Sequence, residues 1–118
     1  MIDRPRRLRT GEAIRSLVRE TRLNPKEFIY PMFVTEGKDV KEPIGAMPGQ
    51  YRYSVDTIAA AVKEIQKCGV NHVMLFGIPH PEDCDAIGSP AFAKDGIVQR
   101  AIKELKDKTD IFITTDVC

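Results

Sequence analysis

Three short apolar runs alternate along the chain with two amphipathic segments. Residues 28–34, 72–77 and 111–115 are continuous apolar runs of strand length, which is typical of strands buried on both faces of a parallel sheet. Between them, apolar side chains recur at helical spacing over residues 55–65 and 97–105. The pattern therefore predicts the order β, α, β, α, β of a parallel α/β fold.

Local signals mark the ends of these elements. Ser54 is a good N-cap for the first helix, Asp56 suits the positive end of the helix dipole, and Gly69 is expected to end the helix. Glycine, proline and charged residues cluster in residues 35–53 and again in residues 79–90. Both segments are predicted to be irregular loops, and long loops are often functional.

Residues 1–26 are predicted to form an arm ahead of the α/β domain, which takes residues 27–118. The arm begins with the basic segment RPRRLR at positions 4–9. A short helical face of apolar residues follows, made by Ala13, Ile14, Leu17 and Val18. No aromatic residue interleaves the arginines, so a solvated or partner-contacting arm is favoured over a nucleic-acid site.

Composition narrows the class of protein further. The 118 residues include 18 Lys plus Arg and 17 Asp plus Glu, a net charge of +1, so no excess of charge attracts nucleic acid or an anionic membrane. No apolar run approaches the ~20 residues of a membrane-spanning helix, and no apolar secretion signal opens the sequence. The three cysteines form no CxxC pair, which argues against a disulfide framework. We therefore expect a cytoplasmic protein with reduced thiols.

The loops between strands and helices limit the choice of α/β fold. Neither carries the GxGxxG or GxxxxGK[ST] pattern that holds phosphates, which argues against a nucleotide site. Three parallel strands leave two edge strands unpaired, whereas repeated βα units can close into an eight-stranded barrel of ~250 residues. The predicted fold class is the first part of a TIM (β/α)8 barrel, about three strands long, preceded by the arm.

Ligands of parallel α/β folds bind beyond the carboxyl ends of the strands, here residues 35–37, 77–79 and 115–118. Asp116 and Cys118 follow the third strand two residues apart, so in extended geometry both side chains point to the same side. A thiolate there could bind zinc. A buried structural cysteine beside a capping aspartate fits the same spacing, and one zinc ligand does not make a site.

Other polar residues are interpreted as structural. The loop after the second strand holds five potential ligands in no ordered spacing, which favours a solvated acidic loop over a metal site: His80, Glu82, Asp83, Cys84 and Asp85. His72 is expected to be a hydrogen-bonded structural histidine. Cys68 and Phe33 are assigned to the core, and Phe76 to the core or to the strand-end face.

Taken together, six ordered segments resemble the porphobilinogen synthase family, also called 5-aminolevulinate dehydratase. They are RPRRLR (4–9), FIYPMFV (28–34), PIGAMPGQYRYS (43–54), GVNHVMLFGIP (69–79), GSPAFAKDGIVQRAIKELK (88–106) and TTDVC (114–118). The resemblance covers nearly the whole chain. It implies an eight-stranded βα barrel, of which this sequence would be about the first third, and an N-terminal arm that embraces a neighbouring subunit within a homo-octamer. The loop PHPEDCDAI (79–87) departs from the family's usual Lys-Asp turn, so no role is carried over to it.

The resemblance also implies a reaction and two site residues. The family condenses two molecules of 5-aminolevulinate into porphobilinogen, a step of tetrapyrrole (heme) biosynthesis. Asp116 matches the family's active-site aspartate, which would orient the substrate amine or move a proton there. Cys118 matches the first of three zinc-binding cysteines, and zinc would act as a Lewis acid near the second substrate.

The resemblance further implies that substrates are held as lysine Schiff bases, on strands that come later in the family. The lysines of this chain, such as Lys63, Lys67, Lys103 and Lys106, fall in charged helix segments, where a solvated ammonium is a poor nucleophile. The chain alone is therefore expected to be inactive. Two rival hypotheses remain. One is a non-enzymatic α/β interaction module that uses the arm and the sheet edges. The other is a receiver-like nucleotide-binding domain, but the missing phosphate loop argues against it.

Overall fold

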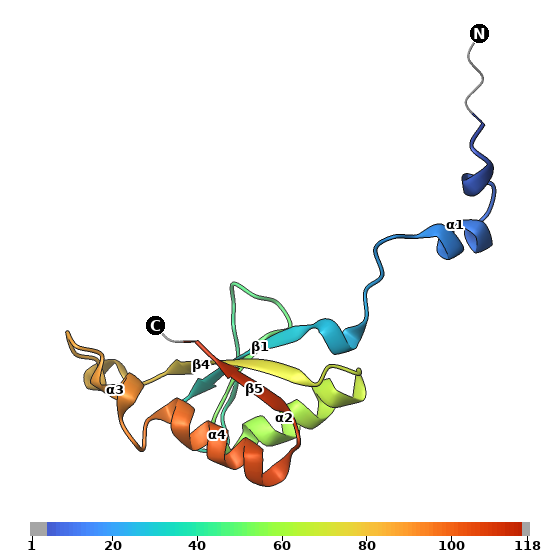
Figure 1. Cartoon of the computed structure of the whole chain (residues 1–118). Coiled ribbons are helices and arrows are strands. Elements are labelled where there is room, and N and C mark those ends of the chain that lie inside the picture. The colour runs from blue at the N-terminus through green and yellow to red at the C-terminus, as the bar shows by residue number, and fades with distance from the viewer. Residues whose placement is uncertain (1–4, 117–118) are drawn as a thin grey trace.

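The computed structural model describes residues 5–116. Its elements run in chain order η1 (Arg7–Arg9), α1 (Glu12–Val18), η2 (Pro25–Glu27), β1 (Ile29–Thr35), β2 (Lys41–Pro43), β3 (Tyr51–Tyr53), α2 (Val55–Lys67), β4 (His72–Ile78), η3 (Pro81–Asp83), α3 (Ser89–Phe92), α4 (Ile97–Lys108) and β5 (Phe112–Thr115). Figure 1 shows α2 and α4 together on one side of the sheet, with the arm leading away from it.

The sheet has the strand order β2-β3-β1-β4-β5. The strands β1, β4 and β5 run parallel, with Ile29 paired to His72 and His72 paired in turn to Phe112. The predicted order of three parallel strands and two helices is therefore confirmed. Because these strands are parallel, their carboxyl ends meet at the same edge of the sheet.

The segment predicted as an irregular loop, residues 35–53, contains two strands, so that prediction was wrong. β2 and β3 pair antiparallel, and β3 also runs parallel to β1 at two residue pairs. Two side chains at the start of α2 hold the segment in place through Val40. Oγ of the N-cap residue Ser54 accepts from the Val40 N–H at 2.9 Å, and Oγ1 of Thr57 donates to the Val40 carbonyl at 2.8 Å. Such tertiary hydrogen bonds leave no periodic signal in the sequence.

The ends of α2 follow the predicted residues with one difference. Ser54 stands at the N-cap but makes no capping hydrogen bond, because its buried hydroxyl is taken by Val40. Asp56 accepts from the Asp39 N–H at 2.9 Å. The pKa of the Asp56 carboxyl is lowered, mainly by a hydrogen bond from the Ser54 side chain and next by the one from the Asp39 N–H. At the other end Gly69 has φ of +87°, a left-handed conformation that glycine adopts without steric cost.

The hydrophobic core lies between the sheet and the two long helices. Its buried members alternate along the strands and recur at helical spacing in α2 and α4: Met32, Val34, Ile58, Ala59, Val62, Val73, Leu75, Ile97, Ala101, Leu105 and Ile111. Burying each large aliphatic side chain contributes about 1.5–3 kcal/mol. This face of the sheet carries the core cluster of buried residues in the described part of the chain.

Within residues 5–116, no helix lies over the other face of the sheet (Figure 1). It carries the alternate residues of the strands, among them Phe33 and Phe76, whose stacked rings lie 5.4 Å apart, and Phe112, whose ring lies 5.3 Å from that of His72. We call this surface the open face. Phe33 is therefore not part of the core under the helices, and that prediction was wrong because a continuous apolar run does not reveal which face a helix covers. Cys68 is the C-cap residue of α2 and is exposed, so its assignment to the core was also wrong.

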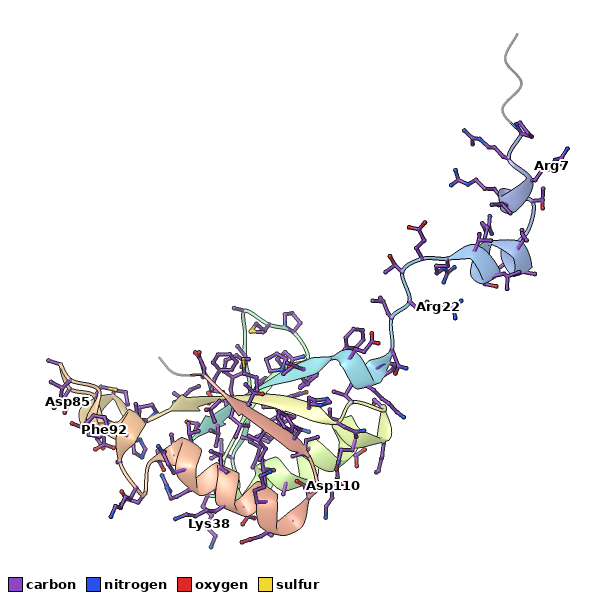
Figure 2. All side chains as sticks on the ribbon, in the orientation of Figure 1. Arg7, Arg22, Lys38, Asp85, Phe92 and Asp110 are labelled. Atoms are coloured by element: carbon purple, nitrogen blue, oxygen red, sulfur yellow. The ribbon has the colours of Figure 1, made fainter. Side chains whose placement is uncertain are left out.

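The arm extends away from the rest of the chain. The radius of gyration is 20.7 Å, against about 13 Å for a compact domain of this length. Three leucines of the arm, Leu8, Leu17 and Leu23, are 56–77% exposed, and Figure 2 shows Arg7 and Arg22 far from the sheet. No helix among the described residues is long and apolar enough to span a membrane.

Candidate functional site

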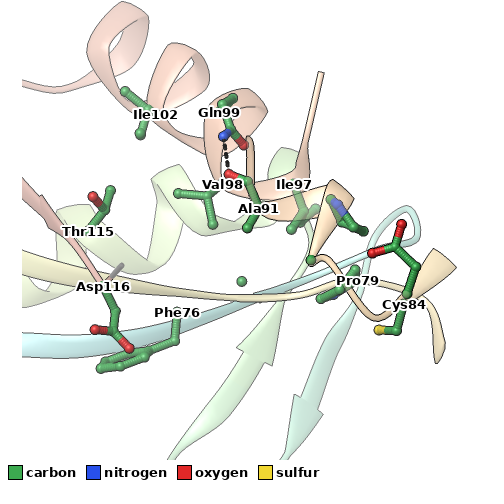
Figure 3. Close-up of a pocket in the computed structure, with 14 residues that line it drawn as sticks. Phe76, Pro79, Cys84, Ala91, Ile97, Val98, Gln99, Ile102, Thr115 and Asp116 are labelled. Atoms are coloured by element: carbon green, nitrogen blue, oxygen red, sulfur yellow. Dashed lines mark hydrogen bonds between the residues drawn. The ribbon is translucent and has the colours of Figure 1, made fainter. Parts of the chain in front are cut away.

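A cavity of about 470 Å³ opens at the carboxyl ends of β4 and β5. Figure 3 shows it between the strand ends, α4 and the segment that contains α3. Its lining is Phe76, Gly77, Pro79, Cys84, Asp85, Gly88, Pro90, Ala91, Ile97, Val98, Gln99, Ile102, Thr115 and Asp116. Pockets that bind small molecules are commonly of this kind, mostly apolar with a few polar groups, and lie at this edge of α/β sheets.

Asp116 is the first residue after β5, as the sequence predicted. Its backbone N–H donates to the Leu75 carbonyl at 3.4 Å, which continues the parallel ladder one step beyond the strand. Its side chain is exposed and lies beside the ring of Phe76 (Figure 3). Of the two placements expected for Phe76, the core and the strand-end face, the structure shows the second, because both Phe76 and Asp116 line the cavity.

The outer wall of the cavity is the segment around α3, which α4 holds in place. Gln99 Nε2 donates to the Ala91 carbonyl at 2.8 Å. A Cβ on Gly96 would lie 2.6 Å from the Pro90 carbonyl oxygen and 2.4 Å from Gln99 Oε1, so only glycine allows this approach of the two backbones. The wall is therefore a packed element attached at defined points.

Asp85 organises the turn that leads into α3. Its carboxylate accepts hydrogen bonds from the Ile87 N–H at 3.2 Å and from the Ser89 N–H and hydroxyl at 2.9 and 2.5 Å. These hydrogen bonds lower the pKa of Asp85, and the bond from the Ser89 side chain has the largest effect. The carboxylate is used within the turn, which explains an acidic residue at the cavity without a catalytic role.

Arg100 joins two strand-end loops. Its guanidinium makes an ion pair with Glu36, directly after β1, and its Nε donates to the Asp95 carbonyl at 2.9 Å. The Glu36 side chain is 19% exposed. The pair fixes the loop after β1 to the start of α4 and so holds two sides of the site in position relative to each other.

The remaining residues singled out from the sequence are not brought together into a site. Among residues 5–116, no group of three or more His, Cys, Asp and Glu side chains could hold a metal ion. His72 packs on Phe112 at the amino end of β4, far along the strand from Asp116. Cys84 lines the cavity and its Sγ donates to the His80 carbonyl at 3.6 Å. Cys118 lies outside the described residues.

No lysine lines the cavity. Lys67 pairs with Glu64 at 2.6 Å on the outer surface of α2. The pKa of Lys108 is raised, mainly by its hydrogen bond to Glu104, whereas a Schiff-base lysine needs a lowered pKa. Among the described residues, nothing suggests a nucleophilic amine.

Three residues of the site escaped the sequence analysis: Gly96, Gln99 and Arg100. Glutamine and arginine are common on helix surfaces, so their types carry no signal. Only the glycine directly before a predicted helix start could have drawn attention to the close backbone approach. Their roles come from contacts with residues up to 64 positions away along the chain.

A parallel sheet backed by helices, with a cavity and a carboxylate at the carboxyl ends of its strands, is the architecture of βα-repeat enzymes. The sequence profile of one such family, described as Delta-aminolevulinic acid dehydratase, matches residues 2–118. The chain belongs to the delta-aminolevulinic acid dehydratase family.

Individual relatives agree with this assignment. The chain is 49% identical to the delta-aminolevulinic acid dehydratase of Methanothermus sociabilis over 115 residues and 43% identical to that of Bacillus subtilis over 117 residues. These alignments cover 98% of this chain in both cases, but 35% and 36% of the relatives. The chain therefore spans about a third of the length of these relatives.

A solved structure extends the agreement to the fold. The delta-aminolevulinic acid dehydratase (porphobilinogen synthase) of Toxoplasma gondii, in complex with the reaction product porphobilinogen, superimposes with a TM-score of 0.92 at 35% identity. The match covers 99% of this chain and 33% of that one. Porphobilinogen synthase is a TIM-barrel enzyme, so the predicted fold class, the first part of a TIM barrel, is confirmed.

Proposed function

We propose that the chain is the N-terminal part of a porphobilinogen synthase, a lyase that condenses two molecules of 5-aminolevulinate into porphobilinogen in heme biosynthesis. The observation that carries the proposal is the family match over residues 2–118, in a chain where the carboxylate of Asp116 lies beside Phe76 at a strand-end cavity. Strand ends of this kind hold the catalytic residues of βα barrels.

Asp116 is the proposed catalytic residue of this chain. Its side chain is exposed at the end of β5, so its carboxyl oxygens can accept a hydrogen bond from a substrate ammonium and hold it there. Proton transfer by a positioned carboxylate contributes a factor of about 10²–10⁴ to a rate. We assign Asp116 the orientation of the substrate amine and the movement of its proton.

Zinc is the proposed metal of the complete enzyme, with Cys118 as one ligand. A zinc site needs three or four protein ligands, and residues 5–116 hold no such group, so the described part of this chain does not make a zinc site. Its other ligands would lie outside this sequence. When bound, zinc would supply Lewis-acid chemistry.

The remaining partners follow from the family assignment. We propose a cytoplasmic homo-oligomer, an octamer as in the full-length family, in which the arm contacts a neighbouring subunit. The exposed leucines of residues 5–24 support this role, because apolar side chains gathered on an extended segment are typical of contact surfaces.

A chimaera tests the proposed reaction. Residues 1–118 are joined to the part of the Methanothermus sociabilis relative that follows the matched region, and porphobilinogen formation from 5-aminolevulinate is measured. We expect product, and a loss of at least about 100-fold in kcat for Asp116→Asn. Asp110→Asn is the matched control, since Asp110 is an exposed aspartate before β5 that bonds only Gln66 Nε2.

Two measurements complete this test. Cys118→Ser in the chimaera should lose zinc that survives dialysis in the parent. The 118-residue chain alone should form no porphobilinogen, with or without zinc. A folded chimaera without activity would contradict the proposed function, and one that still assembles into oligomers would favour the alternative, a non-enzymatic α/β interaction module.

A further inference from the structure

The segment that forms the outer wall of the strand-end cavity has little apolar packing of its own. Its helix α3 has no buried residue, and the side chain of Phe92 is 69% exposed. A helix of a single turn also leaves its last carbonyls without partners inside the helix. The position of α3 beside the cavity therefore depends on the contacts that α4 makes with it.

Gln99 of α4 makes a polar contact with this helix. Its Nε2 donates to the Ala91 carbonyl at 2.8 Å, as the dashed line in Figure 3 marks. Next to this bond the two backbones are already close, since a Cβ on Gly96 would lie 2.6 Å from the Pro90 carbonyl oxygen. The bond from Gln99 thus attaches the wall to α4 at the point of closest approach.

The amide group of Gln99 is only half satisfied. Its Oε1 is buried and has no hydrogen-bond partner within residues 5–116. A buried acceptor without a partner costs free energy, which offsets part of what the Nε2 hydrogen bond contributes. Contacts of low net stability open locally while the rest of the fold stays intact. We therefore expect the wall to move between an attached and a detached position, with the Gln99 bond setting the balance.

The strand end that carries Asp116 is fixed separately from the wall. The Asp116 N–H donates to the Leu75 carbonyl at 3.4 Å, a contact within the sheet. Asp116, Ala91 and Gln99 nevertheless line the same cavity. Movement of the wall would change the space that a ligand occupies, but it would not displace the carboxylate.

We infer that Gln99 is a positioning residue for substrate binding: through the Ala91 carbonyl it holds the wall around α3 against the cavity in which Asp116 meets the substrate. The inference rests on the proposed function and adds a residue that touches neither the substrate nor the reacting atoms. Contacts from the wall act on the bound substrate before and during the reaction alike. Their loss raises KM and leaves kcat unchanged.

Gln99→Met tests the inference, because methionine has a similar length and volume but no donor. In the 118-residue chain, amide exchange of Ala93 and Gly96 reports on the wall, since their N–H groups bond the Ser89 and Ala93 carbonyls. Exchange should become about fivefold faster, within the range expected for one hydrogen bond. In the chimaera, the KM for 5-aminolevulinate should rise about fivefold, with kcat within about twofold of the parent.

Two further variants separate the hydrogen bond from general effects on folding. Gln99→Lys restores an N–H donor on an unbranched side chain, so it should recover part of the protection and part of the loss in KM. Gln66→Met is the matched control, because Gln66 Nε2 also donates one hydrogen bond, to Asp110 Oδ1 at 2.7 Å. That bond lies before the start of β5, at the opposite end of the strand from Asp116, and its loss should change neither the exchange of the wall nor KM.

The inference is overturned if Gln99→Met leaves amide exchange or KM unchanged, or if kcat falls along with the rise in KM. A role in packing alone would give the first of these results, since methionine fills the same space. In a chimaera that makes porphobilinogen, either result contradicts the inference and leaves the proposed function intact. A chimaera that makes none contradicts the proposed function, whereas the exchange rates of the 118-residue chain decide independently whether Gln99 holds the wall.

Discussion

Asp85 and Ser89 are joined by two hydrogen bonds, one from the Ser89 hydroxyl to Oδ2 at 2.5 Å and one from the Ser89 N–H to Oδ1 at 2.9 Å. The pair closes the turn before α3 and so defines the outer wall of the strand-end cavity. Because the acceptor is a carboxylate, the strength of this closure depends on pH.

We expect the turn to loosen in acid. The pKa of Asp85 is lowered in the folded chain, chiefly by the Ser89 hydrogen bond. The stabilisation is therefore complete above the ordinary aspartate pKa of about 3.9 and is lost as the pH falls through the lowered pKa. Amide protection factors of Ile87 and Ser89 should drop in that window. Asp85→Asn should show the low protection already at neutral pH, and equal pH profiles for the two proteins would refute the assignment.

Ser54→Ala should destabilise the fold. The Ser54 side chain is fully buried and its hydroxyl accepts from the Val40 N–H, so its removal leaves that donor without a partner at a cost of about 1–3 kcal/mol. Urea unfolding measures the change. Ser16→Ala is the control, because the Ser16 hydroxyl bonds the Ala13 carbonyl at an exposed site of α1, and its effect should stay within about 0.5 kcal/mol.

Gly77→Ala should separate β4 from α4. A Cβ at Gly77 would lie 2.5 Å from Val98 Cγ2 and 3.0 Å from Ile97 Cγ2, and overpacking of this kind costs about 1–3 kcal/mol. Thermal unfolding should show the loss, with recovery in the double variant Gly77→Ala, Val98→Ala. Gly45→Ala meets nothing within 4 Å and serves as the control. No recovery in the double variant would show that the clash with Val98 is not the cause.

The 118-residue chain should associate in solution. β5 is an edge strand with Phe112 60% exposed, and the arm leaves Leu17 and Leu23 more than 70% exposed. Unpaired strand edges and exposed apolar side chains both promote pairing with another copy. Light scattering at low micromolar concentration should give a dimer or larger. Phe112→Lys and removal of residues 1–24 would tell edge pairing from arm exchange, and a monomer with a cooperative thermal transition would contradict the expectation.

The secondary structure that was predicted correctly is the part with strong periodicity. β1, β4 and β5 are apolar runs of strand length, and α2 and α4 repeat apolar residues at helical spacing, so the type of each element could be predicted. β2 and β3, three residues each, read KEP and YRY and have no such signal. They are held in place because Val40, the residue before β2, makes hydrogen bonds with Ser54 and Thr57. These contacts form only in the folded chain.

The location of the site could be predicted from the sequence, but the residues that hold its walls in place could not. Asp116 could be identified because a carboxylate directly after a buried strand lies at the ligand-binding edge of a parallel sheet. Gln99 and Arg100 could not, since each acts through a partner on another element. Their identity depends on the register between strands and on the closeness of α4, and neither is encoded in local pattern.

The uncovered face of the sheet divides each strand into two interleaved sets of positions. In β1, Met32 and Val34 are buried under the helices, while Phe33 and Thr35 face the other way. A complete substitution scan of β1 in this chain would therefore alternate with a period of two, between positions buried under the helices, which tolerate little, and positions on the open face, which tolerate more.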